Sequence, residues 1–275
     1  MNELFTIISL IAPSGKPNNE IDHYSFNKPS YLSDLFFFAQ TEEVFKQELK
    51  NITHNILWAV RGGYGSYRFS DVDFKNKTLI GFSDITYLFL TNSSIKHKIH
   101  AAHFSDQFLD KNPKNFEFLK NVLQTQNYSW NIPLKYSSPG KDTRIEGKII
   151  GGNLTLITKT IGIIPVNSFA NKILVLEDIG EPPHDVHRNL IHLKKAGYFK
   201  DIKGIIKGTF LSLEQQKNDS EEIYEEIFKE IFQDIPLFFT DHIGHGYNNF
   251  PFIYNQEIII NDFQILLNNS VLFPF

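Results

Sequence analysis

The stretch TLIGFSDITYLFL, residues 78–90, places a short apolar run before a Gly-Phe-Ser-Asp bend and a second apolar run after it. The first run ends at Gly81 and predicts a buried strand, and the second predicts a helix. A serine at such a junction is exposed at the edge of the sheet, beside free helix N–H groups. Ser83 is therefore a candidate nucleophile, although Ile85 replaces the second glycine of the usual G-x-S-x-G pattern. The alternative is that Ser83 or Asp84 only caps the helix.

Two similar apolar runs precede this stretch, at residues 5–12 and 56–60, and each ends at a turn rich in Gly or Pro. Segments with helical spacing lie between the runs, for example residues 32–49. This alternation predicts an α/β fold with an open parallel sheet that helices cover on both faces. Ligands of such sheets bind beyond the carboxyl ends of the strands, where the glycine-containing loops are expected.

A polar stretch at residues 126–144, with two prolines and a Ser-Ser-Pro-Gly turn, predicts a link between two domains. The expected N-terminal α/β domain spans residues 1–135, and a smaller β-rich domain spans residues 136–275. Further predicted elements of the second domain are strands at 145–150, 173–176, 202–206 and 257–260, and a solvated helix at 221–232.

The composition narrows the class of partner and the compartment. The formal charge of −4, from 27 Lys and Arg against 31 Asp and Glu, gives no reason to expect a nucleic-acid or membrane partner. The absence of cysteine excludes disulfides, thiolate metal sites and a cysteine nucleophile. The N-terminus lacks a basic region and contains Glu3, so it is interpreted as a first strand rather than a signal peptide. No apolar run reaches the roughly 18 residues that span a bilayer, and a cytoplasmic protein is expected.

A second glycine-rich loop, RGGYG at residues 61–65, follows the apolar run at 56–60. Glycines at such a place allow backbone N–H groups to approach a ligand closely. The loop matches neither common nucleotide-binding pattern. It can instead supply an oxyanion hole, in which the N–H groups of Gly63 and Asp84 face a developing negative charge. The alternative is a plain tight turn.

A serine nucleophile requires a general base, nearly always histidine, and a group that orients it. The chain has ten histidines. His242 and His245 follow an apolar run and are framed by glycines that would expose the ring. Three further histidines lie close together in the sequence: His184, His187 and His192. No carboxylate completes a zinc pattern around them, so we expect each to have a surface or packing role.

The stretch LEDIGE at residues 176–181 places carboxylates at the end of an apolar run. Glu177 is one residue inside the end of the predicted strand, so it can be partly buried and point at an imidazole. Asp178 and Glu181 are expected to face water. The alternative is that all three carboxylates lie in a solvated loop.

Taken together, these stretches resemble the LD-carboxypeptidase family of serine peptidases, which also contains the microcin-immunity peptidases. The resemblance covers nearly the whole chain. It is carried by IAPSG at 11–15, RGGYG at 61–65, GFSDIT at 81–86, GGNLTL at 151–156, LEDIGE at 176–181, Arg188-Asn189-Leu190, and GHG at 244–246.

The resemblance implies a catalytic triad and an architecture. Ser83 would be the nucleophile, His245 the general base and acid, and Glu177 the residue that orients the imidazole, with His242 as a rival base. The implied fold is a flavodoxin-like parallel sheet flanked by helices, followed by a β-rich, barrel-like domain, so the site would be assembled between the two. A homodimer is implied as well.

The implied reaction releases the terminal D-alanine from a murein tetrapeptide during cytoplasmic cell-wall recycling, through an acyl-enzyme on the serine. No metal and no cofactor are expected. Arg61 and Tyr64 are expected to contact substrate. Arg188 is expected either to hold the second domain against the first or to bind a substrate carboxylate.

Two stretches depart from the family pattern. Ala102-His103-Phe104-Ser105 stands where relatives usually show His-Gly-Pro, so the pocket wall near His103 is expected to differ. The residues after GHG, Tyr247 to Pro251, replace a stretch that usually begins with proline.

Two other functions compete with the murein peptidase. A self-immunity enzyme that cleaves a peptide-nucleotide antibiotic would need a ring to stack on the base, and the tryptophans available are Trp58, in a predicted buried strand, and Trp130, in the predicted link. A non-catalytic ligand-binding module would not need the trio of Ser83, Glu177 and His245.

Overall fold

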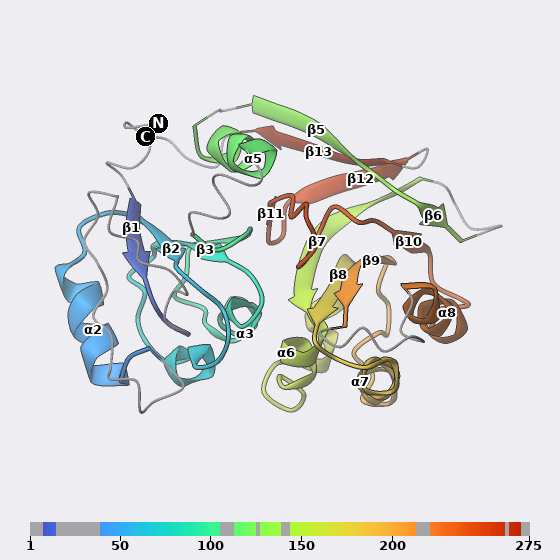
Figure 1. Cartoon of the computed structure of the whole chain (residues 1–275), viewed down its shortest axis with the longest axis horizontal. Helices are drawn as coiled ribbons and strands as arrows, with labels where there is room; N and C mark the ends of the chain where they lie inside the picture. Colours follow the sequence, from blue (N-terminus) through green and yellow to red (C-terminus); the bar gives the residue numbers. More distant parts are fainter. Residues whose placement is uncertain are drawn as a thin grey trace.

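The computed structural model describes residues 8–14, 39–104, 113–124, 127–138, 144–212, 221–261 and 264–270. Two sheets lie side by side, each with helices packed against it (Figure 1). The strand before Ser83 belongs to the first sheet, and Glu177 lies on a strand of the second. The expected α/β fold class is confirmed.

The first sheet has the strand order β1-β2-β3-β4-β11. Its strands are β1 (Ile8–Ile11), β2 (Ile56–Ala59), β3 (Thr78–Gly81), β4 (His97–His100) and β11 (Phe252–Ile253). The first four are parallel, and β11 is antiparallel to β4. β1, β2 and β3 are buried along their whole length, which explains why they are continuous apolar runs. The runs predicted at 56–60 and 78–80 are confirmed as strands, whereas residues 5–7 of the first run lie outside the described residues.

Helical segments of the first half are α2 (Glu42–Asn51), the 3-10 turn η1 (Ser66–Phe69), α3 (Ile85–Thr91) and α5 (Pro113–Gln124). The helix predicted at 32–49 begins later than expected, at Glu42. Thr41 stops its extension toward the N-terminus, because its backbone is extended and its hydroxyl accepts a hydrogen bond from Val44 N–H. Residues 32–38 of the predicted helix lie outside the described residues.

The second sheet has the strand order β5-β13-β12-β7-β8-β9-β10-β6. Its strands are β5 (Asn127–Pro133), β6 (Tyr136–Ser137), β7 (Ile145–Asn153), β8 (Lys172–Ile179), β9 (Gly204–Leu211), β10 (Leu237–Phe239), β12 (Glu257–Asn261) and β13 (Gln264–Ser270). Strands β7 to β10 form a parallel centre, and the remaining pairs are antiparallel. The second half is thus β-rich, as expected, and β5 and β6 are the edges of its sheet.

Helices α6 (Leu154–Thr158), α7 (Pro183–Lys195) and α8 (Glu221–Ile231) lie together along one side of the second sheet, with the 3-10 turn η2 (Val166–Phe169) (Figure 1). The helix predicted at 221–232 is confirmed as α8. It buries Tyr224, Phe228 and Ile231, while its acidic residues are partly exposed or exposed.

The stretch at 126–144, interpreted as a polar link, contains strands β5 and β6, so that interpretation was wrong for most of its length. β5 pairs with β13, from Asn127 with Ser270 to Pro133 with Gln264. The proline stands at the last pair of the strand, where a missing N–H is tolerated. β5 also precedes the boundary expected between residues 135 and 136, and the position of that boundary stays a prediction.

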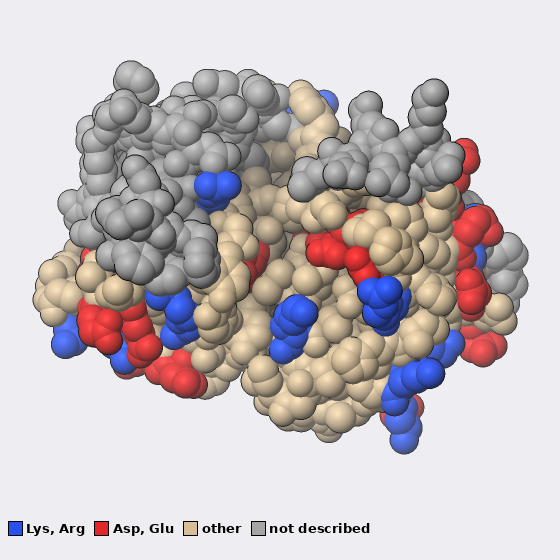
Figure 2. Space-filling model, turned by 60° about the horizontal axis from the view of Figure 1, so that its bottom comes forward, with Lys and Arg blue, Asp and Glu red and all other residues tan. Residues whose placement is uncertain are grey.

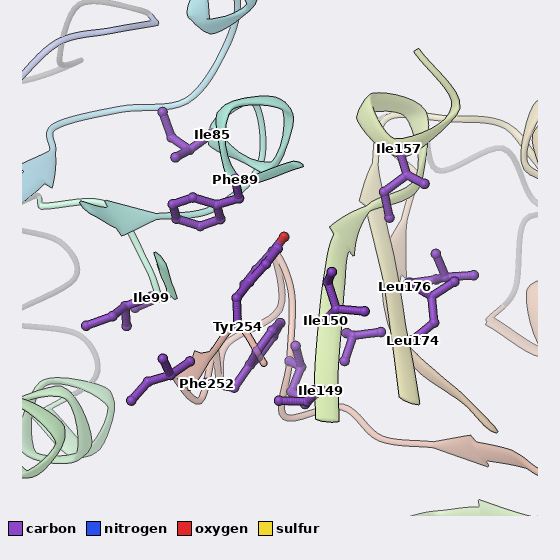
Figure 3. Packing of buried hydrophobic residues seen from close by; sticks show 14 of the residues in the cluster. Ile85, Phe89, Ile99, Ile149, Ile150, Ile157, Leu174, Leu176, Phe252 and Tyr254 are labelled. Atoms are coloured by element: carbon purple, nitrogen blue, oxygen red, sulfur yellow. The ribbon is translucent and has the colours of Figure 1, made fainter. Parts of the chain in front are cut away.

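The two halves share an apolar interface. Figure 3 shows Phe252 and Tyr254 lying between Phe89 and Ile99 of the first half and Ile150 of β7. The rings of Phe89 and Tyr254 are 5.0 Å apart. Tyr254 also donates its hydroxyl to Gly151 O, and its backbone N–H to Lys98 O at 2.9 Å. Buried aromatic rings from the C-terminal half therefore fix the two sheets relative to each other.

On the face shown in Figure 2, the side chains of Lys and Arg are interspersed with those of Asp and Glu. Within the part of the chain that the structure describes, no helix combines the length and the apolar character needed to cross a bilayer.

Candidate active site

Ser83 lies on the bend between β3 and α3, as the sequence predicts. Its φ of 56° is in the left-handed region, which residues other than glycine adopt uncommonly and at a cost in backbone strain. A Cβ on Gly81 would lie only 2.9 Å from Ile85 Cγ1, so the glycine lets the helix pack closely on the strand. The bend is closed by Thr86 N–H, which donates to Ser83 O at 2.9 Å.

Neither side chain of the bend caps α3. Asp84 is buried, with 3% of its surface exposed, and its Oδ2 accepts from Ser14 Oγ at 2.6 Å and from Ser66 N–H at 2.9 Å. Burial raises the pKa of Asp84 above 3.8, against the opposing effect of these hydrogen bonds. The Ser83 side chain is partly exposed and makes no hydrogen bond among the described residues. The capping alternative is therefore wrong for both residues.

Glu177 and His245 form a hydrogen-bonded pair from two distant parts of the chain. His245 Nδ1 lies 2.7 Å from Glu177 Oε2, and the two side chains are 12% and 0% exposed. A carboxylate only accepts, so Nδ1 carries the hydrogen and Nε2 is left to act as a base. Burial lowers the pKa of His245, but the Glu177 charge and hydrogen bond raise it more, and the net pKa is above 6.5.

The Glu177 side chain is enclosed by two glycines. A Cβ on Gly244 would lie 2.9 Å from Glu177 Cβ, and one on Gly208 would lie 3.1 Å from it. Gly244 has a φ of 116°, so the backbone there also favours glycine. Glu177 Oε1 is buried without a hydrogen-bond partner in the described residues, and so are both ring nitrogens of His100. Burial lowers the pKa of His100 to about 4.

The Phe82 ring brings the two halves of the site together. It lies 4.6 Å from the His245 ring and 4.5 Å from the His103 ring, measured between centroids. His245 of the C-terminal half is therefore packed against the residue that precedes Ser83. The Ser83 hydroxyl and the His245 ring form no hydrogen bond in this structure, a contact that is often long in active sites without ligand.

The rival base, His242, lies in a different environment. Its Nδ1 is 3.0 Å from Asn248 Nδ2, and its ring packs edge-on to Phe250 at 5.3 Å. Burial lowers its pKa below 6.5, opposed by the charge of Asp241. Among the described residues, the histidine that hydrogen-bonds to Glu177 is His245 and not His242.

The RGGYG loop packs against the nucleophile bend. A Cβ on Gly62 would lie 3.1 Å from Ser83 Oγ, so only glycine fits there without a shift. Gly63 is exposed, with a φ of 98°. Within the described residues, the N–H groups of Gly63 and Asp84 make no backbone hydrogen bond. Arg61 is exposed, and Tyr64 is 44% exposed. The Tyr64 hydroxyl donates a hydrogen bond to the Tyr67 hydroxyl at 2.9 Å. Arg61 and Tyr64 stay predicted substrate contacts.

Arg188 lies on α7 and is 70% exposed. Its guanidinium pairs with Asp185 on the same helix rather than with the N-terminal half, as far as the described residues extend. The three histidines of the same segment, His184, His187 and His192, are partly exposed or exposed. In the described residues, no group of three or more His, Cys, Asp or Glu side chains could hold a metal ion.

Asp178 was predicted to face water, and this is wrong. It is 3% exposed and accepts hydrogen bonds from Asn153 Nδ2 at 2.6 Å and from the backbone N–H of Thr155 at 2.9 Å. β8 continues to Ile179, so Asp178 lies within the strand and faces the first N–H groups of α6. Burial first, and the Glu177 charge second, raise the pKa of Asp178 to about 6.

Sequence reasoning also missed two residues that hold the site together, Phe82 and His103. Phe82 is part of the Gly-Phe-Ser-Asp bend, and the aromatic ring directly before the serine is the signal that could have identified it. His103 was noted only as a departure from the family pattern. The local sequence did not indicate the contacts of its ring.

Comparison with known proteins gives consistent matches. The model of the LD-carboxypeptidase N-terminal domain matches residues 8–103, and that of the LD-carboxypeptidase C-terminal domain matches residues 146–260. A putative carboxypeptidase of Rickettsia conorii is 34% identical over 240 residues, which cover 81% of this chain and 74% of that protein. A murein tetrapeptide carboxypeptidase of Pseudomonas aeruginosa is 27% identical, with 74% of this chain and 71% of that protein covered.

Two solved structures share the fold. A muramoyltetrapeptide carboxypeptidase from Oxalobacter formigenes superposes with a TM-score of 0.75 at 21% identity, covering 97% of this chain and all of that one. A microcin C7 self-immunity protein superposes with a TM-score of 0.75 at 17% identity, covering 97% of this chain and 96% of that one.

Proposed function

The chain belongs to the LD-carboxypeptidase family and is a carboxypeptidase by that membership, and we propose that it releases the terminal D-alanine of murein tetrapeptides. The proposed nucleophile is Ser83, the proposed base and acid is His245, and Glu177 orients the imidazole. Relatives named for murein peptides, from Bacillus subtilis and Pseudomonas aeruginosa, support this choice of substrate.

The observation that carries the proposal is the buried pair between His245 Nδ1 and Glu177 Oε2, at 2.7 Å, packed through Phe82 against the Ser83 bend. A carboxylate that accepts from one ring nitrogen leaves the other free to take a proton from a serine hydroxyl. A protein that only binds ligand has no need of such a pair beside a strained serine. The non-catalytic alternative is therefore not favoured.

The proposed reaction proceeds in two halves. Ser83 Oγ attacks the carbonyl carbon of the bond between the L-centre of diaminopimelate and D-alanine, and His245 Nε2 takes the hydroxyl proton. The N–H groups of Gly63 and Asp84 stabilise the resulting oxyanion. The C–N bond then breaks, and His245 returns the proton to the amine of D-alanine.

The second half releases the acyl group from Ser83. A water molecule attacks the ester while His245 accepts its proton. The bond to Ser83 Oγ then breaks, and the serine regains a proton from the imidazole. The products of one cycle are D-alanine and the shortened peptide, and the enzyme returns to its starting state. Arg61, Tyr64 and Arg188 are proposed substrate contacts in both halves.

The self-immunity alternative is less favoured by the described side chains. Trp58 is fully buried, and its indole N–H donates to Ala102 O at 2.9 Å, so its ring is not available to stack on a base. Trp130 lies on β5. The likeness to the microcin C7 self-immunity protein, at 17% identity, concerns the fold.

A direct turnover assay tests the proposal. The protein is incubated with murein tetrapeptide, and separately with an aminoacyl sulfamoyl nucleoside, and free D-alanine or free amino acid is quantified. We expect D-alanine release from the tetrapeptide, and a loss of at least about 10³-fold in Ser83→Ala. Cleavage of the nucleoside alone would select the immunity function, and equal release by Ser83→Ala would reject the proposed nucleophile.

Cytoplasmic location and assembly as a homodimer are part of the same proposal, and they rest on the family resemblance. Light scattering on the purified 275-residue chain tests the assembly: a mass of about twice the 31.8 kDa of the chain is expected. A mass of one chain at micromolar concentration would reject the dimer. Fractionation of the native cells tests the location.

A further inference from the structure

The segment after β4, residues 101–104, crosses the carboxyl ends of β3 and β2. Ala101 N–H donates to Gly81 O at 3.0 Å, and Phe104 N–H donates to Ala59 O at 3.0 Å. Both acceptors are the last residues of their strands. The segment is therefore attached by its backbone to the ends of the two strands that lead into the RGGYG loop and the nucleophile bend.

The Trp58 side chain makes a third contact with the segment of residues 101–104. Its indole N–H donates to Ala102 O at 2.9 Å, and its ring packs edge-on to Phe104 at 5.2 Å. Trp58 and Phe104 are both fully buried. The residues on either side of His103 are thus held in place, and the position of the His103 ring is fixed by its neighbours.

The His103 ring joins two backbone groups from different loops. Gly62 N–H donates to His103 Nδ1 at 3.1 Å, and His103 Nε2 lies 3.1 Å from Phe82 O. Because Nδ1 accepts a hydrogen bond and a carbonyl can only accept, the hydrogen is on Nε2 and the ring is neutral. One imidazole therefore satisfies a donor of the RGGYG loop and an acceptor of the bend at the same time.

The space between these loops is filled. A Cβ on Gly62 would lie 2.7 Å from His103 Cε1 and 3.0 Å from Ser83 Cβ. The Phe82 ring also packs on the His103 ring at 4.5 Å. A movement of His103 would therefore be transmitted to both loops, since neither has room to adjust alone.

We propose that His103 is a positioning residue, which clips the RGGYG loop to the nucleophile bend and so fixes the N–H groups of Gly63 and Asp84 relative to Ser83 Oγ. The inference rests on the proposed acyl transfer at Ser83. Because Gly62 N–H is held by the clip, the next N–H along the chain, that of Gly63, stays available for the oxyanion. Oxyanion donors act only if their positions are set before the reaction.

The protonation state of the ring is consistent with this role. Burial lowers the pKa of His103 to about 3. The charges that His245, His100 and Arg61 carry when protonated act in the same direction, and the hydrogen bond to Phe82 O opposes them. A doubly protonated ring would have two donors and could not accept from Gly62 N–H. The clip is therefore intact over the whole range in which His245 can act as a base.

Two substitutions of His103 separate positioning from simple packing. His103→Leu fills the space but has no polar atom, whereas His103→Gln offers an acceptor for Gly62 N–H and a donor for Phe82 O. We expect His103→Leu to lower kcat about 10²-fold with KM changed less than about threefold, and His103→Gln to recover at least about tenfold of that loss. The matched control is His54→Gln, since His54 precedes β2 at the opposite end of the sheet and bonds to Ser9.

The outcomes distinguish the clip from the proposed function. A folded His103→Leu enzyme with kcat within about twofold of wild type, or a Gln variant no better than Leu, would overturn the clip. A second readout needs no turnover: nitrogen-15 NMR of the wild-type histidines. We expect a neutral His103 with hydrogen on Nε2 from pH 5 to 8, and a charged ring or hydrogen on Nδ1 would overturn the inference even if no variant folds. If wild type releases no D-alanine, the proposed function fails and the NMR result still decides the clip.

Discussion

Replacing Glu177 by glutamine tests the orientation of the catalytic imidazole. The side chain keeps its size, so the glycine walls at Gly208 and Gly244 still accommodate it. Its charge is lost at 2.7 Å from His245 Nδ1, in a site where the carboxylate is fully buried. An amide NH₂ turned toward the ring would also hold the imidazole in the wrong tautomer, with the hydrogen on Nε2. We expect kcat to fall about 10³- to 10⁴-fold, or about 4 to 5.5 kcal/mol in transition-state stabilisation.

The pH profile of kcat/KM gives the second readout of Glu177→Gln. In wild type, activity rises with pH as His245 loses its proton, with a midpoint above 6.5 because the Glu177 charge and hydrogen bond outweigh burial. Removing the charge leaves burial to dominate, so the midpoint moves to lower pH. D-alanine release is measured from pH 5 to 9, with Glu146→Gln as control, whose carboxylate is 56% exposed and pairs with Arg144.

The same pair makes a prediction for stability. The pKa of His245 in the folded protein is raised above its unfolded value, so its contribution is fully present below about pH 6.5 and is lost as the pH rises through the folded value. Glu177→Gln removes this dependence, which denaturant unfolding at pH 6 and pH 9 would measure.

A Glu177→Gln variant with activity within about tenfold of wild type and an unchanged acid midpoint of kcat/KM would refute the role of Glu177.

Three further substitutions test the backbone and surface of the site. Gly244→Ala introduces a Cβ 2.5 Å from Thr209 Oγ1 at a φ of 116°. We expect the free energy of unfolding, measured by denaturant titration, to fall by about 3 kcal/mol. An unchanged free energy would contradict the packing described. Gly62→Ala places a Cβ 3.1 Å from Ser83 Oγ and should lower kcat about 10²-fold, whereas wild-type kcat would show that the loops can separate. Arg188→Ala should change the free energy of unfolding by less than about 1 kcal/mol, because the side chain is 70% exposed. A rise in KM of this variant would therefore indicate that Arg188 contacts substrate, and an unchanged KM would reject that contact.

The strand, bend and helix around Ser83 could be predicted because their signals are local. A short apolar run that stops at Gly81 is typical of a buried strand, and the pair of loops at the strand ends follows from parallel topology. The partner of the serine could not be derived in this way. His245 and Glu177 are 68 residues apart, and the family resemblance rather than their spacing selected them before the structure showed the hydrogen bond.

The errors have a common physical cause, which is dependence on contacts distant in sequence. Strand β5 exists because β13, more than a hundred residues later, supplies its hydrogen bonds, and the sequence of 126–144 alone resembles a polar link. Asp178 is buried because α6 begins beside β8 and offers free N–H groups to its carboxylate. The role of His103 depends on two loops that meet only in the folded chain.

The central claim is that Ser83 carries the acyl group between the two halves of the reaction, and peptide mapping of the quenched enzyme tests it most directly. Wild-type protein is mixed with murein tetrapeptide, stopped in acid within one turnover, digested and analysed by mass spectrometry. We expect the peptide that contains GFSDIT to gain the mass of the acyl group left after loss of D-alanine, and Ser83→Ala to show neither the adduct nor turnover. An adduct on another residue, or turnover by Ser83→Ala at the wild-type rate, would contradict the account.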